Sequence, residues 1–218
     1  MKELVCIIIG IIISFSEPKV NNEVIIESSI QQVENVELGT FFMLKNDTKF
    51  IYREKDKKSL NLVLKYWEDL PIKVKQGVKE IHFEDKKGEV AGVTKGTSIT
   101  LYDFSAYNIS TQRHILYHEI GHTFANEMSR LNKLDFDGYI EVVKKDKNYL
   151  SNYSKRKIKE NNNYSEDFAD AFSMYFKDND SLKRKHKNRY EYLENLINGG
   201  IWYEKQKGRN NRKWCVGK

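Results

Sequence analysis

Apolar residues in the first half of the chain follow two patterns, one of which is helical. Residues 59–70 carry them at intervals of three and four, which places them on one stripe of a helix. Ser59 is suited to cap that helix, and Pro71 follows its end. The stripe consists of Leu60, Val63, Leu64 and Trp67.

The second pattern consists of short runs rich in apolar residues after this helix, and these runs predict strands. They lie at residues 78–83, 90–93 and 98–102, and Gly96 is placed to turn the chain between the last two. The sequence therefore predicts a small sheet in this part of the chain.

Residues 17–58 are the predicted N-terminal lead-in to the domain. Their apolar runs, at 24–26 and 41–44, fit either strands or a loosely packed arm. The chain contains no repeat and no Pro- or Gly-rich linker after this segment, so residues 59–218 are predicted to form one domain.

The second half of the chain predicts mainly helices. Ser110 is a candidate cap for the first of them. Together with the strands of the first half, these helices predict an α+β fold. The apolar residues at helical spacing are Leu116, Ile120 and Phe124, then Phe168, Phe172 and Phe176, and finally Tyr190, Leu193, Leu196 and Ile197.

The N-terminus differs from the rest of the chain because residues 4–15 are apolar at all but two positions. This run is too short for a bilayer span, which needs about 20 residues. Its length, and the small residues that follow it, predict a secretory signal peptide over residues 1–16 that is cleaved before Glu17. A retained membrane anchor and a core helix are the alternatives. We therefore expect a secreted protein that contacts a membrane only through an uncleaved signal segment.

Composition and charge narrow the classes of partner. Of the 218 residues, 39% are hydrophobic and 31% are charged, which is enough apolar material for one core. The net charge of +6 is spread along the chain, so we expect no nucleic-acid partner. Cleavage of the signal would leave Cys215 as the only cysteine, which excludes an internal disulfide. We expect a monomer.

Candidate chemistry is concentrated in residues 118–122, His-Glu-Ile-Gly-His. His118 and His122 are one helical turn apart, so both imidazoles can bind one zinc ion. Glu119 then lies beside a water molecule that the metal activates. Two solvent-exposed histidines on an ordinary helix are the alternative.

A catalytic zinc ion needs a third protein ligand, and a carboxylate on another helix is the favoured candidate. His114 lies on the same helix, and one straight helix cannot place three ligands around a tetrahedral ion. Glu166 and Asp170 are one turn apart within residues 164–172. Glu166 is predicted to bind the metal, and Asp170 to accept a hydrogen bond from the ligating His118. An acidic face of an ordinary amphipathic helix is the alternative.

The two motifs together resemble the gluzincin metalloproteases. They are most similar to the catalytic domain of anthrax toxin lethal factor and to the secreted clostridial Pro-Pro endopeptidases, over about residues 78–198. The resemblance implies a zincin-like fold, with a small twisted sheet, an active-site helix and a helical C-terminal half. It also implies one Zn²⁺ ion bound by His118, His122 and Glu166, with Glu119 as the general base and Asp170 as the residue that supports the site.

These families also place a tyrosine seven residues before the glutamate ligand, where it donates a hydrogen bond to the developing oxyanion. This chain has Lys159 at that position. Residues 150–154 resemble the families' approach to that tyrosine, with extra residues inserted afterwards. Tyr153 is therefore the first candidate for the oxyanion donor. Tyr164 and Tyr149 are alternatives, as is a purely structural role for this segment.

The resemblance further implies a protein or peptide substrate that lies extended along an edge strand, for which residues 96–101 are the candidate. Residues 84–110 lack the tryptophan that the Pro-Pro enzymes carry there, so a Pro-Pro preference is not expected. The expected function is that of a secreted zinc-dependent endopeptidase, in which Glu119 is the base and metal-activated water attacks the peptide bond. The alternative is a lethal-factor-like zinc-binding or toxin-component module that is catalytically silent.

Overall fold

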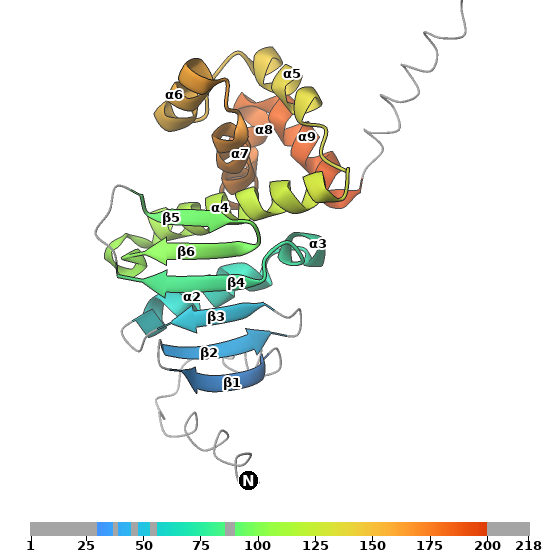
Figure 1. Cartoon of the computed structure of the whole chain (residues 1–218). Coiled ribbons are helices and arrows are strands. Elements are labelled where there is room, and N and C mark those ends of the chain that lie inside the picture. The colour runs from blue at the N-terminus through green and yellow to red at the C-terminus, as the bar shows by residue number, and fades with distance from the viewer. Residues whose placement is uncertain (1–29, 37–38, 45–47, 53–55, 86–89, 200–218) are drawn as a thin grey trace, which may run out of the picture.

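The structure, a computed structural model, describes residues 30–36, 39–44, 48–52, 56–85 and 90–199. These residues form an α+β fold with a sheet in the N-terminal half and a mainly helical C-terminal half (Figure 1). The predicted fold class is confirmed at this level. The predicted signal peptide at residues 1–16 and the strand candidate at 24–26 lie outside the described residues.

Six strands form one mixed sheet: β1 (Ile30–Val36), β2 (Gly39–Leu44), β3 (Lys49–Tyr52), β4 (Glu80–Glu84), β5 (Gly92–Lys95) and β6 (Ser98–Tyr102). Their order is β1-β2-β3-β4-β6-β5. The β3–β4 and β4–β6 pairs are parallel, and the other neighbours are antiparallel. Parallel neighbours need crossover connections, and a helix supplies the one between β3 and β4.

The segment predicted as a lead-in contributes β1, β2 and β3 to this sheet. The candidate strand at 41–44 lies within β2, and β3 pairs with β4. The segment therefore continues the sheet that the later strands begin. The sequence does not predict β1, because its apolar residues, Ile30, Val33 and Val36, recur at every third position and not at every second.

The strands predicted after the helix are present as β4, β5 and β6, but the expected edge strand is wrong. β6 lies between β4 and β5, so residues 96–101 do not form the edge. Lys95 pairs with Ser98, and Gly96 has a φ of 61°, so a two-residue turn reverses the chain there. This hairpin places β5 at the edge, as the strand nearest to the C-terminal helices in Figure 1.

Helix α2 (Lys57–Glu68) lies behind the sheet in Figure 1 and buries all four apolar residues of its predicted stripe. Trp67 meets Phe50 of β3 edge to face, with the ring centroids 5.6 Å apart. The predicted cap is wrong: Asp56 occupies the N-cap position, and Ser59 is buried within the first turn. A short helix, α3 (Ile72–Lys75), begins after Pro71.

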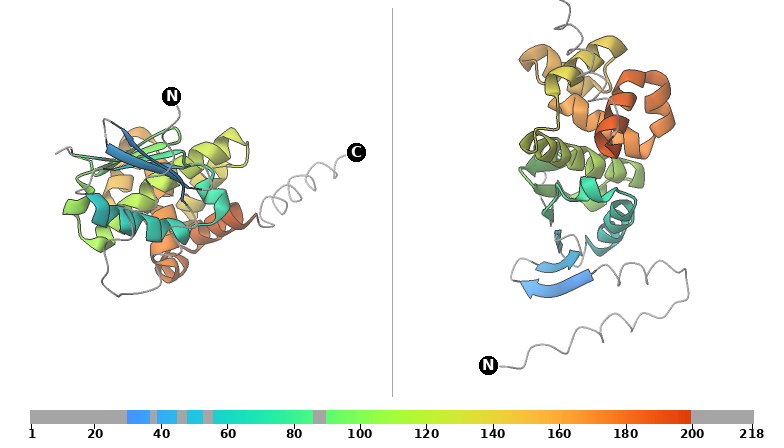
Figure 2. Two further views of the ribbon diagram at one scale, coloured as in Figure 1. Left: turned by 90° about the horizontal axis from the view of Figure 1, so that it is seen from below. Right: turned by 90° about the vertical axis from the view of Figure 1, so that its right-hand side faces the viewer.

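The 22-residue helix α4 (Ile109–Arg130) lies between the sheet and the C-terminal helices, as Figures 1 and 2 both show. It follows a short 3₁₀ turn, η2 (Phe104–Ala106). The cap of α4 is Asn108, whose side chain accepts the backbone N–H of Thr111 at 3.0 Å, and not Ser110 as predicted. Asparagine and serine are similarly good caps, so the sequence does not distinguish them. The predicted apolar face of α4 is fully buried.

The C-terminal half contains α5 (Phe136–Asp146), α6 (Asn152–Asn161), α7 (Ser165–Lys177), α8 (Asn179–Lys185) and α9 (Lys187–Asn198). Helix α7 packs on α4 with Phe168 and Phe172 fully buried and Phe176 partly buried. The segment that the resemblance treats as inserted lies in α6. Among the described residues, no helix is both long and apolar enough to cross a membrane.

A buried ion cluster fixes α7 against α5 and α9. Arg189 of α9 is fully buried, and it donates to both carboxylate oxygens of Asp167, from Nε at 2.8 Å and from Nη2 at 3.0 Å. Its Nη1 also donates to Asp146 at 3.1 Å, and the hydroxyl of Tyr139 donates to Asp167 at 2.8 Å. This cluster fixes the helix that carries Glu166.

Candidate metal centre

His118 and His122 lie one turn apart on α4, where it faces α7. Their rings meet edge to face with centroids 4.8 Å apart, and their Nε2 atoms are 3.2 Å apart. Both side chains are mostly buried, with 14% and 19% exposed. The helix therefore directs one nitrogen of each ring to the same point, as the sequence predicts.

Glu166 reaches this point from the first turn of α7. Its Oε2 is 3.2 Å from Nε2 of His118 and 3.5 Å from Nε2 of His122. The two helices can approach this closely because residue 121 is a glycine: a Cβ atom there would lie 3.1 Å from Cα of Ala169. A larger residue at this position would separate the histidines from the glutamate.

The three donor atoms form a nearly equilateral triangle that fits a zinc ion. In a tetrahedral site with bonds of about 2.0–2.1 Å, neighbouring donors are about 3.3 Å apart. The corresponding distances here are 3.2, 3.2 and 3.5 Å. His118, His122 and Glu166 are thus brought together as a group that could hold a metal ion.

Hydrogen bonding to His118 shows why this group suits a cation. Nδ1 of His118 lies 3.0 Å from Oδ1 of Asp170, and because an ionised carboxylate only accepts, Nδ1 carries the proton. A neutral ring then directs the lone pair of Nε2 toward the carboxylate of Glu166. Either a second proton on His118 or a metal ion removes this repulsion between acceptors.

The pKa shifts of His118 and Glu166 also favour a cation at this site. Burial lowers the pKa of His118, but its hydrogen bonds with Asp170 and Glu166 outweigh burial and raise the pKa to about 10. Burial raises the pKa of Glu166, but hydrogen bonds with His118 and His122 hold it well below its usual range. The groups between α4 and α7 therefore stabilise a positive charge.

Asp170, the predicted acceptor, is itself held by Ser151. The hydroxyl of Ser151 donates to Oδ2 of Asp170 at 2.5 Å. Oγ of Ser151 also accepts the backbone N–H of Ser154, which caps α6. Burial raises the pKa of Asp170, but the bonds from His118 and Ser151 outweigh it and lower the pKa. The sequence signals Ser151 only as a helix cap, so its contact with the site is not predicted.

Glu119 lies against the edge strand β5. Oγ1 of Thr94 is 2.7 Å from Oε2 and 3.1 Å from the backbone oxygen of Glu119, so its proton can be donated to either. Gly92, two residues earlier on the same face of the strand, makes room: a Cβ there would lie 2.8 Å from Cγ of Glu119. Thr94 and Gly92 are two further residues that sequence reasoning missed.

A second grouping of possible ligand atoms comprises His114, His118 and Asp170. His118 offers its other ring nitrogen here, and that nitrogen already donates to Asp170. Nε2 of His114 is 3.9 Å from Oδ1 of Asp170, and its Nδ1 is 2.9 Å from the hydroxyl of Ser173. The distances of this grouping suit a hydrogen-bond network around His118 better than a second metal.

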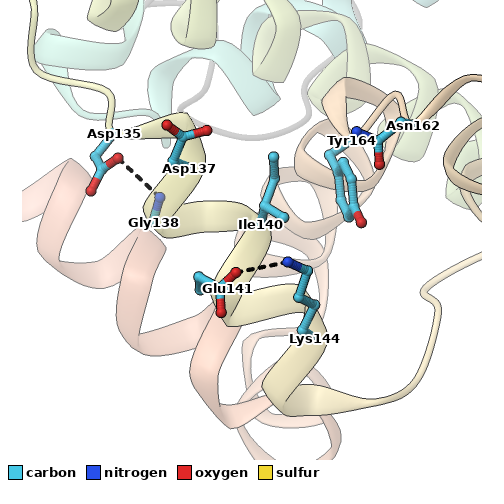
Figure 3. Close-up of a pocket in the computed structure, with 8 residues that line it drawn as sticks. All are labelled: Asp135, Asp137, Gly138, Ile140, Glu141, Lys144, Asn162 and Tyr164. Atoms are coloured by element: carbon cyan, nitrogen blue, oxygen red, sulfur yellow. Dashed lines mark hydrogen bonds and ion pairs between the residues drawn. The ribbon is translucent and has the colours of Figure 1, made fainter.

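The candidate oxyanion tyrosines make none of the contacts described above. Tyr153 is on the first turn of α6, 41% exposed, with the guanidinium of Arg156 5.4 Å from its ring centroid. Tyr164 is buried and lines a pocket of about 460 Å³ along α5 (Figure 3). No predicted metal ligand lines that pocket. The role of Tyr153 stays a prediction.

No model of a known protein family matches the sequence, and no curated protein matches it. The resemblance to gluzincins therefore rests on the two motifs.

Proposed function

We propose that this chain is a secreted zinc-dependent endopeptidase. The observation that carries the proposal is the donor triangle of His118, His122 and Glu166, together with Glu119, which follows His118 on α4 and accepts a hydrogen bond from Thr94 of β5. Two imidazoles and one carboxylate favour zinc over harder cations, and three protein ligands are typical of catalytic zinc sites. Secretion is supported only by the apolar pattern of residues 1–16.

His118, His122 and Glu166 would hold the ion, and the groups behind them would orient the ligands. Asp170 keeps one proton of His118 on Nδ1, so that Nε2 is the nitrogen that binds the metal once the second proton is lost. When bound, zinc supplies a Lewis acid that lowers the pKa of water and polarises a carbonyl group.

Glu119 is the proposed general base. Its carboxylate takes a proton from the attacking water and returns it to the nitrogen of the leaving amine. Thr94 binds Oε2, which leaves Oε1 for the proton transfer. Tyr153 is the proposed donor of a hydrogen bond to the oxyanion.

The proposed substrate is a protein or peptide that binds in extended form along β5. In the described part of the chain, β5 pairs only with β6, so its outer N–H and C=O groups are available to another strand. Gly92 and Thr94 contact Glu119 from this same strand. A peptide paired with β5 would therefore lie beside the base.

The test incubates the purified chain and zinc with a diverse peptide mixture and identifies new termini by mass spectrometry. Glu119→Gln should retain zinc and lower turnover by about 10²–10⁴-fold, because it removes the base. Glu166→Ala should lose zinc. Cuts made equally by the Glu119→Gln variant would contradict the mechanism, and a zinc-loaded chain that makes no cuts would favour a catalytically silent metal-binding module.

A further inference from the structure

Exposed tyrosine rings and cations lie together on helix α6 and at Tyr149, two residues before the cap Ser151. Lys155, Arg156 and Lys159 are exposed, and in the described part of the chain none of them has a carboxylate partner. Tyr149 and Tyr153 are 39% and 41% exposed. The ammonium of Lys155 lies 5.8 Å from the ring centroid of Tyr149. These five residues are called the α6 surface below.

Helix α6 has a larger excess of cations over carboxylates than the neighbouring helices. Helix α6 carries four cations and one acidic residue, Glu160. Several exposed cations elsewhere pair with a carboxylate one turn away, which neutralises them locally. These pairs are Arg130–Glu127, Lys144–Glu141 and Lys187–Glu191. An acidic ligand would supply the balance that the chain does not provide on α6.

The N-terminal end of α6 contacts the residues that support the metal centre. Ser151, the cap of α6, donates to Asp170, and Asp170 accepts from His118. Tyr153 follows Ser151 by two residues and lies in the first turn. A strand advances about 3.3 Å per residue, so a peptide with its reacting bond at the metal centre needs only a few further residues to reach α6.

We propose that the α6 surface binds an acidic segment of the substrate close to the bond that is cleaved. The inference rests on the proposed function, because it names the class of substrate that the same site takes. Arg156 and the lysines supply ion pairs, and the tyrosine rings supply contact area with a polar tip, a combination enriched in protein interfaces. Specificity would then come from charge on α6, while pairing with β5 supplies affinity for backbone.

The first experiment measures binding without cleavage. The full zinc-loaded chain with Glu119→Gln is titrated with labelled peptides that share one centre and carry three glutamates, three glutamines or three lysines on either side. We expect the glutamate peptides to bind most tightly. The preference should disappear between about 0.01 M and about 1 M salt, over which the screening length falls from about 30 Å to about 3 Å. Equal binding of all three peptides at low salt would overturn the inference.

Two variants matched in charge locate the effect. Replacing Lys155, Arg156 and Lys159 together with glutamine should weaken binding of the glutamate peptides about tenfold, the sum of three exposed ion pairs. The control removes the same charge from α8, where all three replaced residues are exposed. It consists of Lys183→Gln, Arg184→Gln and Lys185→Gln. Equal weakening by both variants would mean that net charge alone is responsible, which overturns the inference.

Cleavage by the unmutated chain separates this inference from the proposed function. Faster cleavage of the glutamate peptides, with the preference reduced in the α6 variant only, supports both. Cleavage without any preference for flanking charge overturns the inference and leaves the endopeptidase standing. Binding of the glutamate peptides through α6 without cleavage of any peptide supports the binding surface and contradicts the proposed function.

Discussion

Helix α7 contributes to two buried charged clusters, and they differ in how the charge is balanced. Glu166 and Asp167 are adjacent in the sequence but contact different partners. Asp167 meets Arg189, whose guanidinium donates to both of its oxygens. Glu166 meets the imidazole nitrogens of His118 and His122 instead. One cluster contains a permanent cation, and the other contains groups whose charge depends on a proton or a metal.

This difference separates a structural cluster from a binding site. Burial lowers the pKa of Arg189, but its bonds with Asp167, together with the nearby Tyr139 and Asp146, raise it beyond its usual range, so the guanidinium stays protonated at any ordinary pH. At the metal centre, Asp170 and Glu166 face His118, which can release its proton to make way for an ion. The chain itself completes the cluster of Asp167, Asp146 and Arg189, which we call the closed cluster. The cluster of His118, His122 and Glu166, which we call the open cluster, is left for a ligand to complete.

The largest effect is expected from breaking the closed cluster. Arg189→Met leaves Asp167 and Asp146 buried without their cation, so the free energy of unfolding should fall by about 3–5 kcal/mol. Chemical denaturation of the zinc-free chain measures this change. Arg130→Met, which breaks an exposed pair with Glu127, is the control and should leave stability nearly unchanged. A loss at Arg189 no larger than that at Arg130 would contradict the comparison.

The open cluster should respond to pH, because the charge of His118 changes within an accessible range. The pKa of His118 is raised from 6.5 to about 10, so its contribution to the stability of the zinc-free chain is complete below about pH 6.5 and is lost as the pH rises to about 10. Zinc must displace that proton, so the apparent zinc affinity should rise over the same window, by about 100-fold across two pH units. Calorimetric titrations in several buffers count the protons released. An affinity that stays constant across this window would show that His118 is not protonated in the zinc-free chain.

The sequence predicts the parts of the site that depend on spacing along one helix. His118 and His122 are one turn apart, as are Glu166 and Asp170, and the predicted contact between His118 and Asp170 is confirmed. Spacing along one helix could not predict that Glu166 joins His118 and His122, because Glu166 lies on a second helix. That prediction depended on the second motif.

Contacts between distant segments are what the sequence does not predict. Ser151 and Thr94 have no spacing relation to the residues they hold, Asp170 and Glu119. The edge strand is also misassigned, because the order of β5 and β6 depends on which of them pairs with β4. In both cases the decisive partner lies on another element of the fold.

Weakening the support of the open cluster should lower zinc affinity without removing a ligand. Asp170→Asn replaces the charged acceptor of His118 with a neutral one, and we expect a loss of about 10–100-fold in zinc affinity. Ser151→Ala should have a smaller effect in the same direction, because it acts through Asp170. Competition with a chelator measures both variants. Asp137→Asn on the exposed surface of α5 is the control, and an equal loss there would refute a specific role for Asp170.

The smallest effect is expected from a change at Thr94, which orients the base Glu119 and is not itself a metal ligand. Thr94→Val keeps the shape of the side chain but removes the hydrogen bond to Oε2 of Glu119, which leaves the carboxylate less well oriented for proton transfer. We expect kcat to fall about tenfold, with KM and zinc affinity unchanged, because a hydrogen bond to a charged group is worth about 1.5–3 kcal/mol when complete. Thr94→Ser restores the hydroxyl and should restore most of kcat. If the valine variant turns over as fast as the unmutated chain, the packing of Glu119 against Gly92 is enough to orient the base, and the contribution of β5 is then one of shape and not of hydrogen bonding.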